Sequence, residues 1–231
     1  MPQLSAFTRM LWAANHSVDD FTVSLNQVRL PLQWFESFAD LAFGPMERRC
    51  RRRAPHSVLI TFDGSLTGGG ATLQAGVTQY NTAHQQPYVA YWHDEWTSAE
   101  LELLQVIRDD PAGQARLEAW TMLCSIVVWK DILRKADGGL AVMGDALGVL
   151  HGAQKFKSND AVLNLIMAEA ALILAPMGRD LRAVHLWTQR NITCDRLSRL
   201  QKSPADITEL QGVTRSIRHI PECKVLSSRR C

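Results

Sequence analysis

The stretch Ser57-Val-Leu-Ile-Thr-Phe-Asp-Gly-Ser65 decides the fold. Its first six residues are apolar and rich in β-branched side chains, which is typical of a buried strand. Asp63, Gly64 and Ser65 then end the strand, because these residue types favour turns. After three glycines at 68–70, residues 71–77 and 86–92 are two further strand candidates, with the second antiparallel to the first. The sequence therefore predicts a sheet that opens with antiparallel neighbours.

Downstream of this portion the pattern changes to alternating helices and strands. The spacing predicts helices over residues 112–135, 145–156, 159–174 and 192–200, and strands over 140–143 and 182–187. An antiparallel portion followed by alternating strands and helices indicates a mixed sheet with a parallel βαβ part. We therefore predict an α/β fold whose mixed, five-stranded sheet is flanked by helices.

Composition limits the class of protein. The chain has 231 residues, 46% of them hydrophobic, which suits one domain with extensions. The formal charge of +2 predicts no general affinity for polyanions, so any basic surface is local. Five scattered cysteines without C-x-x-C pairs favour a reduced intracellular setting, cytoplasmic or nuclear. Neither a signal peptide nor an apolar run of ~20 residues is present in the sequence, so we expect no membrane partner.

Four acids stand where strands end or helices begin: Asp63, Glu118, Asp145 and Asp195. Carboxylates in such places can converge on one edge of a sheet, and hard oxygen ligands suit Mg²⁺ or Mn²⁺. Two such ions about 4 Å apart can clamp both oxygens of a phosphodiester displacement. Each acid alone also has an ordinary structural explanation as a turn former, a helix-dipole partner or a cap.

The local sequence around these acids resembles the ribonuclease H domain of retroelement reverse transcriptases. Thr61-Phe-Asp-Gly-Ser65 with Gly69-Gly-Ala71 is similar to the family's opening strand, and Glu118-Ala119 to its acidic helix. Gly144-Asp145 is similar to the third acidic motif. The most specific match is residues 185–199, HLWTQRNITCDRLSR, against the pattern H-x-P-G-x-x-N-x-x-A-D-x-L-S-R.

The resemblance implies a site and an activity. Asp63, Glu118, Asp145 and Asp195 would hold two Mg²⁺ or Mn²⁺ ions, with Asp63 bridging both. His185 would assist proton transfer or product release. The substrate would be an RNA–DNA hybrid whose RNA strand is cut by hydrolysis, recognised by its shape and 2′-hydroxyl groups. The residues expected to contact nucleic acid are Ser65, Asn191, Arg190, Arg196 and Arg199.

The resemblance also divides the chain. Residues 56–202 are expected to form the ribonuclease H-like domain, and residues 203–231 a basic, mobile tail. Residues 1–55 are expected to be a helical extension resembling the segment that connects polymerase to ribonuclease H, which makes a polymerase portion a further expected partner. The stretch 81–110 is long for this fold. We expect it to be an insertion with its acids in solvent, namely Asp94, Glu95, Glu100, Glu102, Asp109 and Asp110.

Departures from the family pattern keep other functions open. Trp187-Thr188 stands where the family has Pro-Gly, Cys194 replaces its Ala, and Ala146 replaces the Ser or Asn after the third acid. A catalytically decayed domain that binds nucleic acid or serves as a scaffold is the main alternative. Transposases, integrases and exonucleases, which have related carboxylate sites, are a third class. Trp187 lies in an apolar context, like Trp34, Trp120 and Trp129, so core packing is expected for all four tryptophans.

Overall fold

The structure is a computed structural model that describes residues 28–29, 31–33, 36, 56–76, 88–136, 138–178, 181–199 and 207–218. The predicted helical extension of residues 1–55 lies almost wholly outside these residues, so the extension stays a prediction. Within the described ranges, no helix is long and apolar enough to cross a membrane.

A six-stranded mixed sheet forms the centre of the domain, in the order β5-β4-β1-β2-β3-β6. The strands are β1 (His56–Gly64), β2 (Gly68–Ala75), β3 (Tyr88–Glu95), β4 (Gly139–Gly144), β5 (Leu181–His185) and β6 (Thr214–Arg215). β1 pairs antiparallel with β2 and parallel with β4, while β3 continues the antiparallel part and β5 the parallel part. The predicted mixed sheet flanked by helices is confirmed, with six strands in place of five.

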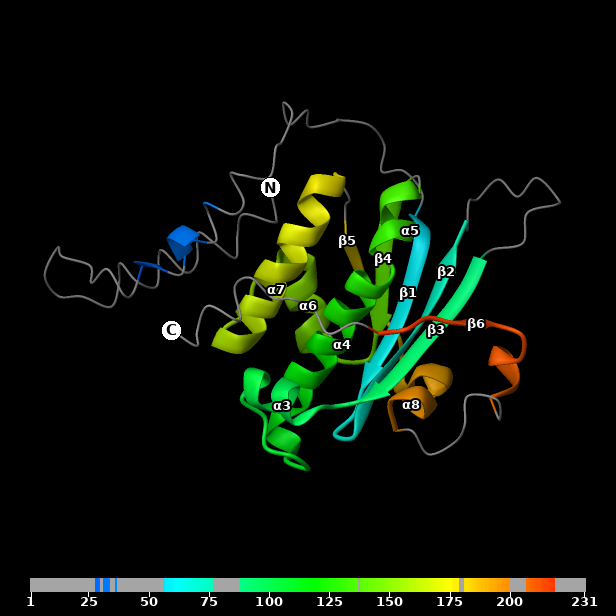
Figure 1. The fold of residues 1–231 in the computed structure, drawn as a ribbon, viewed down its shortest axis with the longest axis horizontal. Coiled ribbons are helices and arrows are strands. Elements are labelled where there is room, and N and C mark those ends of the chain that lie inside the picture. Colours follow the sequence, from blue (N-terminus) through cyan, green and yellow to red (C-terminus); the bar gives the residue numbers. More distant parts are fainter. Residues whose placement is uncertain are drawn as a thin grey trace, which may run out of the picture.

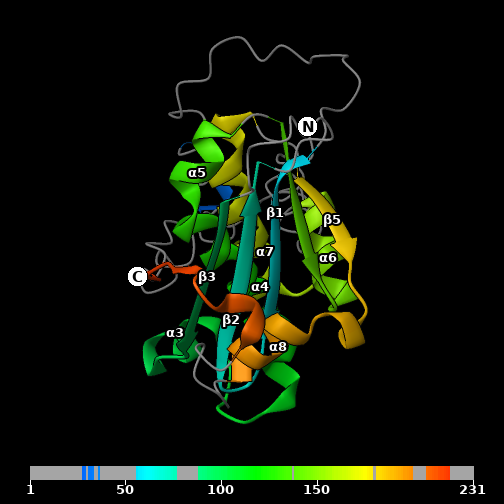
Figure 2. The same ribbon diagram turned by 90° about the vertical axis from the view of Figure 1, so that its right-hand side faces the viewer.

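Helices cover both faces of the sheet. They are α3 (Ser98–Leu104), α4 (Gln114–Val128), α5 (Lys130–Lys135), α6 (Leu147–Lys155), α7 (Ala161–Leu174) and α8 (Ile192–Arg199). α4, α6 and α7 lie together on one face, and α8 crosses the other face over β1, β2 and β3 (Figures 1 and 2). The predicted helix over 112–135 is in fact two helices, because the backbone leaves helical geometry at Trp129.

The main core lies between the sheet and α4 and α7. Phe62 and Trp92 from the sheet and Trp120 from α4 have no exposed surface, and Trp129 is also buried. Core packing is therefore confirmed for Trp120 and Trp129. It is wrong for Trp187, whose side chain is 68% exposed because it follows the end of β5 and lies beyond the sheet. Trp34 lies outside the described residues.

Residues 207–218 pack onto the domain, although the sequence predicts a mobile tail from residue 203. β6 adds to the edge of β3, and Ser216 N donates a hydrogen bond to Tyr91 O at 2.7 Å. Ile207 and Leu210 are buried in a small cluster with Tyr91 and Leu197.

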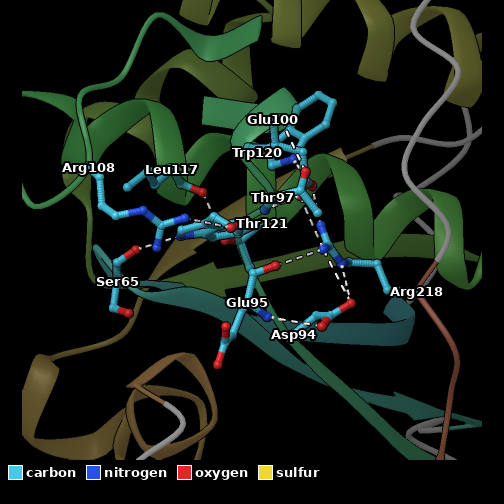
Figure 3. A network of polar contacts seen from close by, with 11 residues as sticks. Ser65, Asp94, Glu95, Thr97, Glu100, Arg108, Leu117, Trp120, Thr121 and Arg218 are labelled. Atoms are coloured by element: carbon cyan, nitrogen blue, oxygen red, sulfur yellow. Dashed lines mark hydrogen bonds and ion pairs between the residues drawn. The ribbon is translucent and has the colours of Figure 1, made fainter. Parts of the chain in front are cut away.

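This segment also corrects the expectation that Glu100 faces solvent. Glu100 is 1% exposed and forms an ion pair with Arg218, whose side chain is 3% exposed (Figure 3). Trp120 Nε1 donates to Glu100 Oε1 at 2.8 Å. A partner 118 residues away leaves no trace in local periodicity, so the burial of Glu100 could not be predicted from the surrounding sequence.

Candidate active site

Two glycines let helices approach the sheet closely from opposite faces. A Cβ atom at Gly64 would lie 2.8 Å from Leu117 O and 2.9 Å from the Cα of Glu118, so β1 contacts the backbone of α4 there. A Cβ at Gly70 would lie 2.9 Å from the carbonyl carbon of Leu197, on α8. These approaches bring an acid of α4 and an acid of α8 to the end of β1.

Asp63 lies at that end of β1 and is 7% exposed. Ser198 Oγ on α8 donates a hydrogen bond to its Oδ2. The pKa of Asp63 is raised to about 6, mainly because the carboxyl is buried. The hydrogen bond from Ser198 lowers this pKa, whereas the negative charges of Asp145 and Asp195 raise it. Removal of this proton therefore becomes easier if a cation approaches.

Glu118 on α4 is the second buried acid, at 8% exposure. Gln114 Nε2, one turn earlier, donates to its Oε1 at 3.2 Å and also to Gly64 O. Oε2 is buried and has no hydrogen-bond partner among the described residues. Burial raises the pKa of Glu118 to about 8, opposed by Gln114 and supported by the charges of Asp63 and Asp145.

Asp145 and Asp195 complete the group at its more exposed side. Asp145 follows β4 directly, and its charge acts on both Asp63 and Glu118. Asp195 lies in the first turn of α8, where its charge acts on Asp63 and its Oδ1 accepts a hydrogen bond from Arg199 Nε at 2.7 Å. The structure thus places Asp145 and Asp195 near enough for their charges to act on Asp63, and Asp63 and Asp145 near enough to act on Glu118.

The donor set fits a hard divalent cation, although no cation-binding geometry is already formed. Among the described residues, no three His, Cys, Asp or Glu side chains are arranged to hold a metal ion. Ser198 and Arg199 occupy one oxygen each of Asp63 and Asp195. The Glu118 Oε2, buried without a hydrogen-bond partner among the described residues, and the neighbouring carboxylate oxygens are nevertheless donors of the kind that a hard divalent cation prefers.

The other predicted site residues differ in their burial and in their hydrogen-bond partners. His185 ends β5 opposite Gly144, and the described residues give it no hydrogen bond to any of the four acids. Ser65 is buried in the β1–β2 turn, where its Oγ donates to Ser198 O at 2.7 Å. Asn191 is 2% exposed and donates to Phe62 O at 3.2 Å.

The arginines predicted to contact nucleic acid differ in their surroundings. Arg190 and Arg196 are exposed, and the described residues give neither an ion-pair partner. Arg199 is exposed but bound to Asp195. Phosphate contact stays a prediction for all three.

Comparison with known proteins finds structural neighbours only. No family model and no curated protein matches the sequence. An LC11 ribonuclease H1 isolated from compost by a metagenomic approach is 18% identical, with a TM-score of 0.38, over 62% of this chain and 92% of that one. Its complex with an RNA/DNA hybrid gives 17% identity and a TM-score of 0.35, over 61% and 92% of the two chains.

A foamy viral protease-reverse transcriptase in complex with double-stranded DNA is a further neighbour. It is 15% identical with a TM-score of 0.34, over 79% of this chain but 30% of its own. The structural neighbours are thus ribonuclease H1 and a protein that includes a reverse transcriptase. Similarity at these levels assigns no role to any residue of this chain.

Sequence reasoning missed two polar residues that hold the acids. Gln114 orients Glu118, and nothing in its surroundings marks it, because it stands four residues before Glu118 at the start of an ordinary helix. Ser198 belongs to the Leu-Ser-Arg sequence that ends the last motif. That motif predicts where Ser198 lies in the chain, but it does not predict the hydrogen bond that Ser198 donates to Asp63. Gly64 and Gly70 carry no sequence signal for their close approach to α4 and α8, because glycine is equally common in ordinary turns.

Proposed function

We propose that this domain hydrolyses the RNA strand of RNA–DNA hybrids with the help of divalent cations, and that it derives from a retroelement reverse transcriptase. The observation that carries the proposal is the mutual effect of acids from separate elements: the charges of Asp145 and Asp195 act on Asp63, and those of Asp63 and Asp145 act on Glu118. Like charges that are buried together cost free energy unless something binds them. The motif order around these acids, together with the resemblance of residues 185–199, favours the ribonuclease H reaction over other uses of such a site.

In this proposal the four acids hold Mg²⁺ or Mn²⁺, which when bound would activate the attacking water and stabilise the leaving oxygen. Gln114 holds one oxygen of Glu118 by a hydrogen bond, which leaves the buried Oε2 as the oxygen proposed to bind the cation. Ser198 orients Asp63 in the same manner from the opposite face. His185, at the neighbouring strand end, is proposed to carry a proton to or from the reacting phosphate.

One observation favours the alternative of a decayed, nucleic-acid-binding domain. Arg199 forms an ion pair with Asp195, and Ser198 occupies Asp63, so two of the proposed ligands have partners without a metal ion. For the proposed activity, Asp195 has to release the Arg199 guanidinium and bind a divalent metal ion in its place. The pair is half-exposed, with side-chain exposures of 52% and 34%, so it contributes little stability and opposes that exchange weakly.

The test is cleavage of a labelled RNA–DNA hybrid beside matching RNA and DNA duplexes, with Mg²⁺ or Mn²⁺. We expect cutting of the RNA strand in the hybrid alone, with 5′-phosphate and 3′-hydroxyl ends. Asp63→Asn should abolish it, while Asp160→Asn, which changes an acid that instead pairs with Arg116, should leave it intact.

Metal binding is measured separately by calorimetry on the full chain. Wild-type protein should bind Mn²⁺, and Asp63→Asn should lose that binding with little change in melting temperature. A folded wild-type protein that binds no divalent ion and cuts no hybrid would contradict the proposal and favour the decayed domain.

A further inference from the structure

Trp187 presents its indole to solvent from a backbone that is held firmly. Leu186 N donates to Gly144 O at 2.8 Å, and Arg190 N donates to Trp187 O at 2.7 Å, so the turn is fixed on both sides of the ring. The side chain is nonetheless 68% exposed. A single exposed hydrophobic side chain is common on protein surfaces, so its position decides whether it has a function.

The position is the edge of the sheet that carries the four acids. The indole lies against the His185 ring in an edge-to-face contact, with ring centres 5.0 Å apart. His185 pairs with Gly144 across β4 and β5, and Asp145 is the residue that follows Gly144 at the end of β4. Two other exposed apolar side chains lie close to the same acids in the sequence: Leu147 follows Asp145 by two residues, and Ile192 precedes Asp195 by three.

Positive charge accompanies this apolar surface. Arg190 follows Trp187 by three residues and Arg196 lies on α8, and both are exposed without an ion-pair partner among the described residues. An exposed aromatic side chain, followed within one turn by one such arginine and on the next helix by another, suits a nucleic-acid strand, whose bases stack and whose phosphates carry negative charge. A hydrophobic peptide would match the indole but not the arginines.

We propose that Trp187 is a stacking platform for an unpaired nucleobase beside the four acids, so that the favoured substrate is a hybrid carrying single-stranded nucleotides. The inference rests on the nucleic-acid binding of the proposed function. In the interior of a duplex both faces of each base are covered by its neighbours, so away from the duplex ends only an unpaired base offers a free face to an indole. Stacking of this kind tolerates any base, because every base has a π-face.

The test compares the binding of two labelled hybrids by fluorescence anisotropy in EDTA, which prevents metal-dependent cleavage. One hybrid is blunt, and the other has a tail of three unpaired nucleotides containing 2-aminopurine. Wild-type full-length chain should bind the tailed hybrid more tightly and quench the 2-aminopurine. Trp187→Ala should weaken tailed binding about tenfold, as expected for the loss of one stacked base, and should change blunt binding less than twofold.

Trp187→Phe keeps an aromatic face and should retain most of the tail preference. Tyr88→Ala is the matched control, because Tyr88 is a 46% exposed aromatic residue at the far end of β3 and should have no effect on either hybrid. Equal losses on both hybrids in Trp187→Ala, no loss on either, or a wild-type protein without tail preference would overturn the inference. If the protein prefers the tailed hybrid but does not cleave it in Mg²⁺, the stacking role of Trp187 is supported and the proposed hydrolysis is contradicted.

Discussion

At the scale of single residues, burial of the Glu118 carboxyl in the candidate site lowers the free energy of unfolding at high pH. Its carboxyl is buried with one oxygen unpartnered, which raises its pKa from 4.5 to about 8. The folded protein therefore keeps a proton that the unfolded chain releases. The free energy of unfolding should be highest below about pH 4.5, as far as this group is concerned, and should fall as pH rises to about 8.

Glu118→Gln should remove this pH dependence. Each pKa unit corresponds to about 1.4 kcal/mol, so the variant should be more stable than wild type by ~1–4 kcal/mol at pH 8 and nearly equal at pH 4.5. Thermal unfolding in EDTA at both pH values measures it. Gln114→Ala is the comparison, because it should destabilise the protein without removing the slope. A stability difference that is the same at both pH values would contradict the assignment.

A bound cation should act on the same carboxyls with the opposite sign. Mg²⁺ favours ionised Glu118 and Asp63, whose raised pKa values oppose ionisation in the metal-free protein. We therefore expect Mg²⁺ to raise the melting temperature more at pH 8 than at pH 5, and the calorimetric titration should release protons. Asp63→Asn should lose most of both effects. An equal rise at both pH values would show that the ion binds elsewhere.

The acids themselves could be predicted from sequence, but their state could not. Asp63, Glu118, Asp145 and Asp195 each stand in a recognisable local pattern with a position on a strand end or helix start. The partnerless oxygen of Glu118 and the contact of Ser198 with Asp63 depend on how α4 and α8 pack across the sheet. Such packing is set by residues more than 50 positions apart, which leave no mark on one another's neighbourhood.

At the scale of elements, the glycines of β2 fix the separation of α8 from the sheet. A Cβ at Gly70 would lie 2.3 Å from the Cβ of Leu197 and 3.0 Å from Ser198 N. Gly70→Ala should therefore push α8 outward, lengthen the Ser198 to Asp63 contact and destabilise the domain by ~1–3 kcal/mol. Urea unfolding measures the loss. Gly76→Ala is a poor control because Gly76 has a positive φ, whereas Gly148→Ala meets no atom within 4 Å and should be neutral.

The sequence predicts helices and strands well where apolar residues form clear runs, and less well where an element depends on a partner that is distant in the sequence. β1, β4 and β5 were found within one or two residues, because their apolar runs are bounded by glycine or turn residues. β3 runs on to Glu95, past the predicted end at Trp92, because β2 offers its backbone along that whole length. The break at Trp129 was missed, since the apolar pattern continues through it.

At the scale of the whole molecule, the segment 207–218 closes the domain around Arg218. The guanidinium lies 5.8 Å from the centre of the Trp92 ring and 5.6 Å from that of Trp96, and it pairs with Glu100 and Asp94. Trp96 in turn donates to Ser65 O at 2.8 Å, beside the candidate site. The sheet edge, α3 and the turn after β1 are thus joined through one arginine that sequence analysis assigned to a mobile tail.

Arg218→Ala should consequently be among the most damaging single changes in the described part of the chain. It leaves Glu100, 1% exposed, without its cation, and breaking a buried pair from one side costs about 3–5 kcal/mol. Urea unfolding should show that loss, and Arg218→Met with Glu100→Gln should lose less than Arg218→Ala, because no charge is then left buried. Arg215→Ala, an exposed neighbour on β6, should cost less than about 1 kcal/mol. If Arg218→Ala and Arg215→Ala unfold at the same urea concentration, the segment does not close the domain and Glu100 finds water or another partner when Arg218 is gone.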